Sequence, residues 1–354
     1  MSKIDELARR TGEWLRGGGP LSEVVISTRI RLARNVAGFP FLSRCSEQQR
    51  NEVQKVLKEH IERLDLGQEL FYVDIDQADE LDRLVLMERQ LISRQHAEGE
   101  GSRGVGISAS ETIALMVNEE DHLRIQVLRS GLGLPETWEE IDRIDDMLGE
   151  SLEYAYHRRY GYLTACPTNV GTGIRVSVML HLPALKFTGQ LDQVFQAARD
   201  MRLAVRGLYG EGTEAVGDFY QLSNQTTLGK SEGQIISEFE QILPKVIDYE
   251  KRARQALLRD KLTSLDDKVW RAYGMLQYAR SVSSEETLFL LSHLRMGVNL
   301  GRIDQLSLKT VNELMLSTQP GHLQKLRGER LAGEQRDAIR AEYIRQRLHG
   351  PSEN

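Results

Sequence analysis

The pattern of apolar residues changes near residue 231, and this change limits the possible folds more than any other feature. Before it, short β-like runs such as ELFYVDI, TIALMVN and HLRIQVL alternate with helical stretches. After it, from SEGQIISEFEQIL onward, the spacing is helical and no convincing strand follows. The sequence therefore predicts an α+β unit, with a mainly antiparallel sheet, followed by an all-helical unit. We place the boundary near residue 255 of 354, after an N-terminal helix and linker over residues 1–22.

Local signals assign further elements in the first unit. Residues 4–16 are expected to form one amphipathic helix that GGGP ends. Ser46 and Gln49 have the spacing of a capping box at the start of a helix, and residues 78–92 and 135–157 also have helical patterns. The glycine-rich stretch AEGEGSRGVG is expected to be a mobile loop. RLAVRGLYG and DFYQLSN form another predicted strand pair.

Composition argues against several classes of protein. The net charge of −6 is opposite in sign to that of a generic nucleic-acid-binding protein. No apolar run reaches the roughly 18 residues of a membrane span, and the N-terminus lacks the apolar core of a signal peptide. The presence of only two cysteines, Cys45 and Cys166, argues against a disulfide framework. We therefore expect a cytoplasmic protein.

Familiar catalytic motifs are absent. LGKS resembles the end of a P-loop, but the first glycine of that motif would fall on Asn224. The chain has no H-E-x-x-H and no C-x-x-C, which argues against zinc, and it lacks the protein-kinase motifs.

Arginines near strand ends and glycine turns remain as candidates for chemistry. They are Arg29, Arg31, Arg124, Arg175 and Arg206, with the carboxylates Glu119, Glu120, Asp121 and Glu211 in turns between them. Arginine offers a planar fork that suits bidentate phosphate contacts. Taken alone, such arginines are more often solvated, the EED turn is more often a polar hairpin, and a lone cysteine is more often a small buried residue.

Four sequence blocks carry a resemblance to a known family. VVISTRIRLARN, NEEDHLRIQ, CPTNVGTGIRVSV and VRGLYGEG resemble, in the same order, signature blocks of the phosphagen (guanidino) kinases. The resemblance covers residues 23–255. GYLT, LGKSE and the segment RDAIRA make the chain most similar to the bacterial protein arginine kinases of that family.

This resemblance implies a site for Mg²⁺ and ATP, with Mg²⁺ held mainly by the nucleotide and by no protein ligand. Gln90 stands where the family often has a histidine beside the base or ribose. The implied nucleotide contacts are Ser27, Thr28, Arg29, Ile30, Arg31, Gln90, Arg124, Arg175, Val176, Ser177, Val178, Met179, Arg206, Gly207, Leu208, Tyr209, Gly210 and Glu211.

The resemblance also implies the catalytic residues Glu120, Glu211 and Cys166, which would hold the substrate guanidinium. An arginine side chain has a pKa above 12, so its nitrogen is a poor nucleophile. Two carboxylates can orient the planar group and accept its proton, and we assign the base to Glu120. A thiol among arginines is expected to ionise readily, and a thiolate would favour the guanidinium.

Two features favour arginine on a protein as the substrate. Small-molecule phosphagen kinases carry an additional helical domain before the first block. In this sequence the first block begins near residue 24, so we expect no such domain before it. RDAIRA resembles an allosteric phosphoarginine pocket, whose residues would be Arg336, Asp337, Ala338, Ile339, Arg340 and Ala341. Without the family resemblance, this segment would be assigned to a solvated basic helix.

We therefore expect an ATP-dependent protein arginine kinase. The resemblance implies a role in bacterial stress response, with a heat-shock repressor and damaged proteins as substrates, a zinc-binding activator protein, a Clp-type unfoldase or protease, and a homodimer. Three alternatives stay open: a kinase for free arginine or another small guanidino compound, a phosphoarginine-binding adapter without turnover, and a nucleic-acid binder that uses the arginines.

Overall fold

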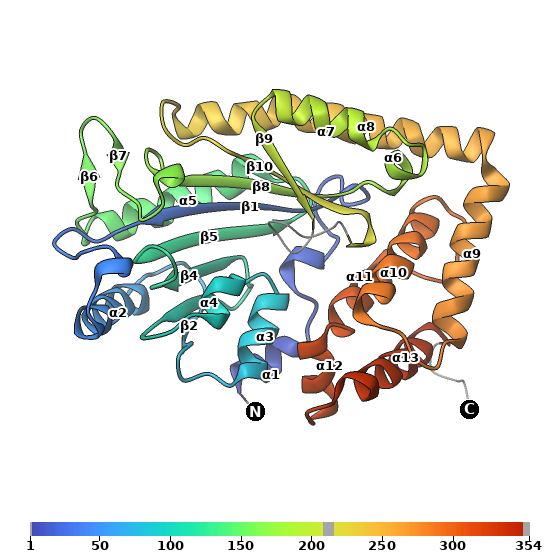
Figure 1. Ribbon diagram of the computed structural model, residues 1–354, viewed down its shortest axis with the longest axis horizontal. Helices are drawn as coiled ribbons and strands as arrows, with labels where there is room; N and C mark the ends of the chain where they lie inside the picture. The colour runs from blue at the N-terminus through green and yellow to red at the C-terminus, as the bar shows by residue number, and fades with distance from the viewer. Residues whose placement is uncertain (1, 208–215, 350–354) are drawn as a thin grey trace.

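The computed structural model describes residues 2–207 and 216–349. Its centre is an eight-stranded sheet with the strand order β2-β3-β4-β5-β1-β8-β10-β9, and neighbouring strands all run antiparallel. Helices flank this sheet, and the C-terminal part of the chain is a separate group of helices (Figure 1). The predicted α+β class with a helical C-terminal unit is confirmed.

The elements have the following bounds. The strands of the main sheet are β1 (Val25–Arg34), β2 (Leu70–Asp74), β3 (Gly104–Ser108), β4 (Ile113–Val117), β5 (Leu123–Ser130), β8 (Ile174–His181), β9 (Leu203–Gly207) and β10 (Phe219–Asn224). A separate hairpin is formed by β6 (Tyr156–His157) and β7 (Gly161–Tyr162). The helices of the first unit are α1 (Lys3–Ala8), α2 (Glu47–Glu62), α3 (Glu80–Glu88), α4 (Arg94–Glu98), α5 (Leu134–Gly149), α6 (Pro183–Phe187), α7 (Leu191–Asp200) and α8 (Glu232–Asp260). Those of the C-terminal unit are α9 (Leu262–Tyr278), α10 (Ser284–Asn299), α11 (Leu308–Ser317), α12 (Pro320–Arg327) and α13 (Gly333–His349).

The central strands have one apolar and one polar face, because neighbouring side chains point to opposite sides. In β1, Ile30 and Leu32 are fully buried in the main core. Helix α5 packs against β1 and β5, and α8 packs against β8, so these helices cover the apolar side (Figure 1). Arg29 and Arg31 alternate with the apolar residues and therefore lie on the other side of the sheet.

The N-terminal helix is shorter than predicted. Helix α1 ends at Ala8, and a separate 3₁₀ turn covers Glu13–Leu15. Gly12 between them has an extended backbone. Leu7 packs in a small core with α3, whereas Leu15 belongs to the main core, so the chain has to change direction between two apolar clusters. The helical period of residues 4–16 did not reveal this division.

Two other predictions need correction. The predicted loop over residues 97–106 contains the end of α4 and the start of β3, so the loop itself is shorter, and Gly106 allows close packing. A Cβ atom at Gly106 would lie 2.6 Å from Ile61 Cγ2. The helix predicted over 135–157 ends at Gly149, because the following chain pairs with the end of β1, where the Ala155 amide donates to Asn35.

The two units are joined continuously. Helix α8 runs through residue 255 to Asp260, and α9 begins at Leu262. The C-terminal helices then fold back, so that α12 packs on α3 and α11 on the Glu13–Leu15 turn (Figure 1). The fully buried Arg295 of α10 donates to the carbonyl oxygens of Ser22 and Glu23, at 2.5 and 3.2 Å. Among the helices that the structure describes, none has the length and apolarity to cross a bilayer.

Candidate active site

Arginines from neighbouring strands gather on the polar face of the sheet, which we call the arginine face. In the strand register, Arg31 lies opposite Arg175 of β8 and opposite Gln126 of β5. Arg124 lies two residues before Gln126 and therefore on the same side. Arg206 of β9 reaches this side as well, because its partner Gln221 on β10 is in register with Met179 of β8.

The arginine face is electrostatically prepared for an anion. Burial, together with the neighbouring Arg124 and Arg175, lowers the pKa of Arg29 to about 10. Burial and the same neighbours, with Arg29 itself, also lower the pKa of Arg31. Arg31 Nε and Ser177 Oγ are buried without a hydrogen-bond partner in the described part of the chain. A polyphosphate would relieve this repulsion and supply acceptors, so the arginine face fits ATP.

Neutral side chains orient the arginines. Arg29 donates through Nη1 to Gln90 Oε1 at 3.0 Å and through Nη2 to Gln221 Oε1 at 2.8 Å. Arg175 Nη2 donates to Ser223 Oγ at 3.1 Å. The roles of Gln221 and Ser223 were not predicted, although alternating polar residues in the buried strand DFYQLSN are a signal for them.

Two cavities border this face. A very small one is lined by Ser27, Arg29, Gln90, Ser177 and Met179, among others, which places these predicted nucleotide contacts together. A larger cavity of about 290 Å³ is lined by Thr168, Asn169, Ile174, Arg175, Arg206, Asn224, Gln225 and Thr227. The larger cavity therefore lies between Arg175 and Arg206, which suit phosphate contacts, and the segment that follows Cys166.

Four predicted contacts have side chains on the other side of the sheet. Thr28 is in register with Val178, and Ile30 with Val176, and all four are buried opposite the arginines. They hold the strands in place and do not line the arginine face. Gly207 pairs with Tyr220 at the end of β9. Leu208, Tyr209, Gly210 and Glu211 lie outside the described residues.

The neighbouring acids Glu119 and Glu120 have different environments. Glu119 is buried, which raises its pKa, but an ion pair with Arg124 and a 2.5 Å hydrogen bond from Ser93 outweigh this and lower it. Burial raises the pKa of the half-buried Glu120. The nearby acids raise this pKa further, and Arg124 offsets only part of the rise. Among residues 2–207 and 216–349, the Glu120 carboxylate accepts no hydrogen bond. The Glu120 carboxylate is therefore able to accept a proton from a substrate.

Asp121 ties this acidic turn to the cysteine segment. Its Oδ1 accepts from Ala165 N and from Asn35 Nδ2, both at 2.6 Å. Asp121 is buried, and the residue after Ala165 is Cys166. The carboxylate therefore holds the backbone that carries the thiol next to the turn that carries Glu120. The sequence placed Asp121 among the turn acids but did not indicate this role.

Two glycines allow the cysteine segment to approach the sheet. Gly171 and Gly173 have φ angles of 118° and 66°. A Cβ atom at Gly171 would lie 2.4 Å from the Thr227 carbonyl oxygen, and one at Gly173 would lie 2.6 Å from that of Ala33. Glycine meets both the conformational and the steric demand. The turn brings the chain from Cys166 into β8 and so toward Arg175.

The two cysteines are both partly exposed but have different surroundings, and this difference gives a first prediction. Cys45 Sγ donates to the Pro40 carbonyl oxygen at 3.0 Å, and burial raises its pKa. Cys166 is partly exposed and lies 2.9 Å from Thr168 Oγ1. We expect iodoacetamide near neutral pH to modify Cys166 first and to stop phosphoryl transfer, measured by peptide mass spectrometry beside activity. Inactivation should persist in Cys45→Ser, whereas the activity that remains in Cys166→Ser should be insensitive to iodoacetamide; the reverse pattern would contradict the site.

The RDAIRA segment lies in α13, away from the sheet. Arg340 is buried, and its guanidinium donates to the carbonyl oxygens of Thr318 and Val282 at 2.8 Å and to Asp337 Oδ1 at 2.6 Å. Arg336 is more exposed and has one long contact, 3.4 Å, to the Leu331 carbonyl oxygen. The two arginines one turn apart thus have different surroundings. Ala338, Ile339 and Ala341 complete the segment within the same helix.

Within the described ranges, no group of three or more histidines, cysteines or acids could hold a metal ion.

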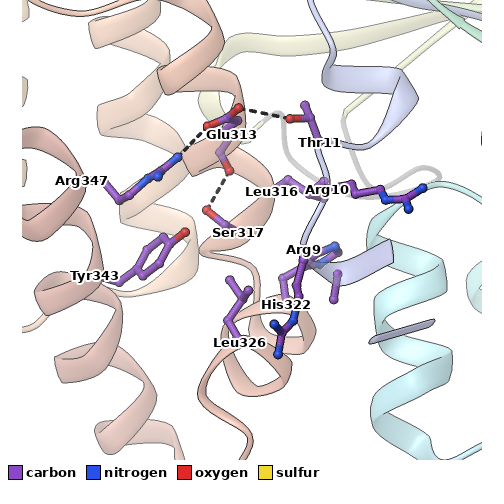
Figure 2. A pocket seen from close by; sticks show the side chains of 11 residues that line it. Arg9, Arg10, Thr11, Glu313, Leu316, Ser317, His322, Leu326, Tyr343 and Arg347 are labelled. Atoms are coloured by element: carbon purple, nitrogen blue, oxygen red, sulfur yellow. Dashed lines mark hydrogen bonds and ion pairs between the residues drawn. The ribbon is translucent and has the colours of Figure 1, made fainter. Parts of the chain in front are cut away.

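A cavity of about 340 Å³ separates the N-terminal segment from α11, α12 and α13 (Figure 2). Inside it, Glu313 binds Arg347 and Thr11. No residue predicted for the site lines this cavity.

Family models match most of the chain. Residues 52–253 match the ATP:guanido phosphotransferase C-terminal catalytic domain, and residues 262–354 match the protein-arginine kinase McsB C-terminal domain. Two curated relatives carry the name protein-arginine kinase. The one from Halothermothrix orenii is 43% identical over 350 residues, which are 99% of this chain and 100% of that protein. The one from Brevibacillus brevis is 45% identical over 98% of each chain.

Solved structures are similar in fold over about two thirds of the chain. The duplicated taurocyamine kinase from Schistosoma mansoni superimposes with a TM-score of 0.61 at 30% identity, over 66% of this chain and 34% of that one. A lombricine kinase superimposes with a TM-score of 0.59 at 27% identity, over 69% of each chain.

Proposed function

The chain belongs to the ATP:guanido phosphotransferase family and phosphorylates arginine with ATP, and from this premise we propose how its residues share the reaction. The arginine face binds the ATP phosphates, and Glu120 accepts the proton of the attacking guanidinium. The observation that carries the proposal is the convergence of Arg29, Arg31 and Arg175 on one face. Mg²⁺, which enters with the nucleotide, neutralises part of the phosphate charge.

The arginines stabilise the charge on the transferring group. Arg29 and Arg175 are already oriented by Gln90, Gln221 and Ser223, so little reorganisation is needed when the phosphates bind. Donors that are held in place before reaction contribute more than donors that must be gathered during it. Gln90 has an amide where the family often has a histidine, and it stays a proposed nucleotide contact.

The acidic turn and Cys166 hold the acceptor. The guanidinium nitrogen attacks the γ-phosphorus, its proton passes to Glu120, and ADP leaves. The raised pKa of Glu120 makes it a better proton acceptor than an ordinary carboxylate, because its charge is held in a partly buried site. We propose that Glu211 forms the second side of the guanidinium clamp.

We also propose arginine on proteins as the physiological acceptor, supported by the full-length likeness to the protein-arginine kinases and by the C-terminal domain match. The test is incubation with Mg-ATP and either an unstructured arginine-containing protein or free arginine. The products would be read by mass spectrometry under non-acidic conditions. A phosphoryl gain on the protein alone supports the proposal. A gain on free arginine alone favours the small-molecule kinase, and neither gain, with phosphoarginine still bound, favours the adapter.

The likeness supports further proposals about cellular context. We propose a heat-shock repressor and damaged proteins as substrates, a zinc-binding activator, delivery of marked proteins to a Clp-type protease, a homodimer, and a cytoplasmic location in a stress response. We propose a domain division into residues 1–22, 23–255 and 256–354. Purification of the native complex with mass-spectrometric identification of its members would test the partners.

We propose that the RDAIRA segment binds phosphoarginine chiefly through Arg336, since Arg340 is occupied by the fold. Arg340→Ala would leave two buried carbonyl oxygens without a donor and should lower the free energy of unfolding by about 3 kcal/mol. Arg336→Ala should change it by less than about 0.5 kcal/mol and yet weaken phosphoarginine binding. Urea unfolding and calorimetry with free phosphoarginine measure the two effects. Equal loss of stability in both variants would contradict this division.

A further inference from the structure

The end of α3 and the start of α12 meet in a buried polar contact. Glu88 accepts hydrogen bonds from the Gly321 amide at 2.7 Å, the His322 amide at 3.0 Å and His322 Nδ1 at 2.6 Å. All these groups are buried. The Glu88 carboxylate thus caps a helix that lies 233 residues further along the chain, where the helix dipole favours negative charge.

Arg89 extends this contact. It donates through Nε and Nη2 to the Glu111 carboxylate at 2.6 and 2.5 Å, and its Nη1 lies 3.1 Å from both His322 Nε2 and the Arg10 carbonyl oxygen. Burial lowers the pKa of His322, which favours a neutral ring, and the Arg89 guanidinium can only donate to Nε2. A neutral ring with the proton on Nδ1 satisfies both neighbours, because Nδ1 donates to Glu88 and Nε2 accepts from Arg89.

Gln90, the next residue, has a backbone conformation that needs support. Its φ angle is +62°, in the left-handed region where glycine usually ends a helix. The turn is closed by hydrogen bonds from Gln90 N to Met87 O and from Leu91 N to Leu86 O, at 2.9 and 3.0 Å. A side chain in this region persists only where its surroundings hold it.

Gln90 in turn reaches the arginine face. Its side-chain oxygen accepts from Arg29, and its carbonyl oxygen accepts from Gln126 Nε2 at 2.7 Å. An unbroken set of contacts therefore runs from α12 of the helical unit through Glu88 and Arg89 to Gln90 and Arg29. Figure 2 shows His322 beside the cavity between the N-terminal segment and the C-terminal helices.

We infer that Glu88, Arg89 and His322, which we call the α3–α12 link, are positioning residues for nucleotide binding. They hold Gln90 in its left-handed conformation and, through it, aim Arg29 at the phosphates. Helix α12 thereby becomes part of the nucleotide site without touching the nucleotide. This inference rests on the assignment of Arg29 to that site.

The test measures Mg-ATP affinity of the full chain by calorimetry. His322→Ala should raise the Kd for ATP by about fivefold or more, since coupling between linked sites is typically of this size. His322→Asn keeps a donor near the Nδ1 position and should recover part of the affinity. Lys325→Ala is the matched control, because Lys325 joins the same helix to Asp5 and to Asp82 in the first turn of α3, at 2.8 and 2.5 Å. These ion pairs do not include Glu88, Arg89 or His322. This control variant should lower the melting temperature and leave the Kd unchanged.

A double variant separates positioning from general loss of structure. In a Gln90→Gly background the left-handed turn needs no support, so adding His322→Ala should produce no further rise in Kd. Additive effects, or equal rises in Kd for His322→Ala and Lys325→Ala, would overturn the inference. Arg29→Gln tests the proposed nucleotide site separately from the α3–α12 link. If this variant leaves the Kd for ATP unchanged, the proposed nucleotide site is wrong, whatever the α3–α12 link does.

Discussion

Glu120→Gln is expected to lower kcat for arginine phosphorylation by roughly 10²- to 10⁴-fold, the usual contribution of a general base. The variant removes the proton acceptor and keeps the shape of the side chain. Since the Glu120 carboxylate accepts no hydrogen bond among the described residues, the melting temperature and the affinity for ATP should be unchanged. Steady-state kinetics, thermal unfolding and nucleotide calorimetry together measure the three quantities.

Glu119→Gln is the neighbouring control and should behave differently. It breaks the buried ion pair with Arg124, so it should reduce stability and ATP affinity before it affects the chemical step. If Glu119→Gln stopped phosphoryl transfer with nucleotide binding intact, and Glu120→Gln did not, the two roles would have to be exchanged.

The pH profile gives the Glu120 assignment an independent readout. The base works as a carboxylate, and its pKa is raised by burial, with Asp121 and Glu119 adding to the effect. The rate should therefore fall as pH drops through a pKa above the ordinary value for glutamate. Asp121→Asn removes one nearby charge and retains an acceptor for Ala165, so it should move this acid limb to lower pH. An unmoved limb would assign it to another group.

Arg29→Gln is expected to lower kcat/KM by roughly 10²- to 10³-fold without loss of stability. The Arg29 guanidinium is held on the arginine face by Gln90 and Gln221, two neutral side chains that leave its charge unbalanced. Burial and the neighbouring arginines already lower its pKa to about 10, so removing the charge relieves repulsion. The melting temperature should stay the same or rise, as is common where function conflicts with stability.

Arg34→Gln is the matched control on the same strand. Arg34 is buried and donates through Nε and Nη2 to Asp145, with its Nη2 at 2.6 Å from Oδ2. Breaking such a pair leaves a buried charge and should cost about 3–5 kcal/mol of stability. Arg29→Gln and Arg34→Gln should thus show opposite profiles in thermal unfolding. A comparable loss of stability in Arg29→Gln would mean that Arg29 supports the fold.

Local rules, which act between residues close in the chain, determine much of this protein. The capping box of Ser46 and Gln49 forms as predicted at the start of α2, because its partners are only three residues apart. The period of two in STRIRLAR places Arg29 and Arg31 on one face of β1 for the same reason. The family blocks then named the arginines, the acids and the cysteine as one functional set.

The tertiary structure decided what lies beyond the reach of neighbouring residues. Gln90 and Gln221 both hold Arg29, and they reach it only because the fold brings together segments that are distant in sequence. Asp121 acquires its role only when the Ala165 amide is brought to it, and Glu88 only when α12 folds back onto α3. Periodicity describes which face a residue takes, whereas a hydrogen bond between distant segments depends on register and packing. The sequence and its resemblance therefore proposed most members of the site, whereas the fold added Gln221 and Ser223 and fixed the geometry.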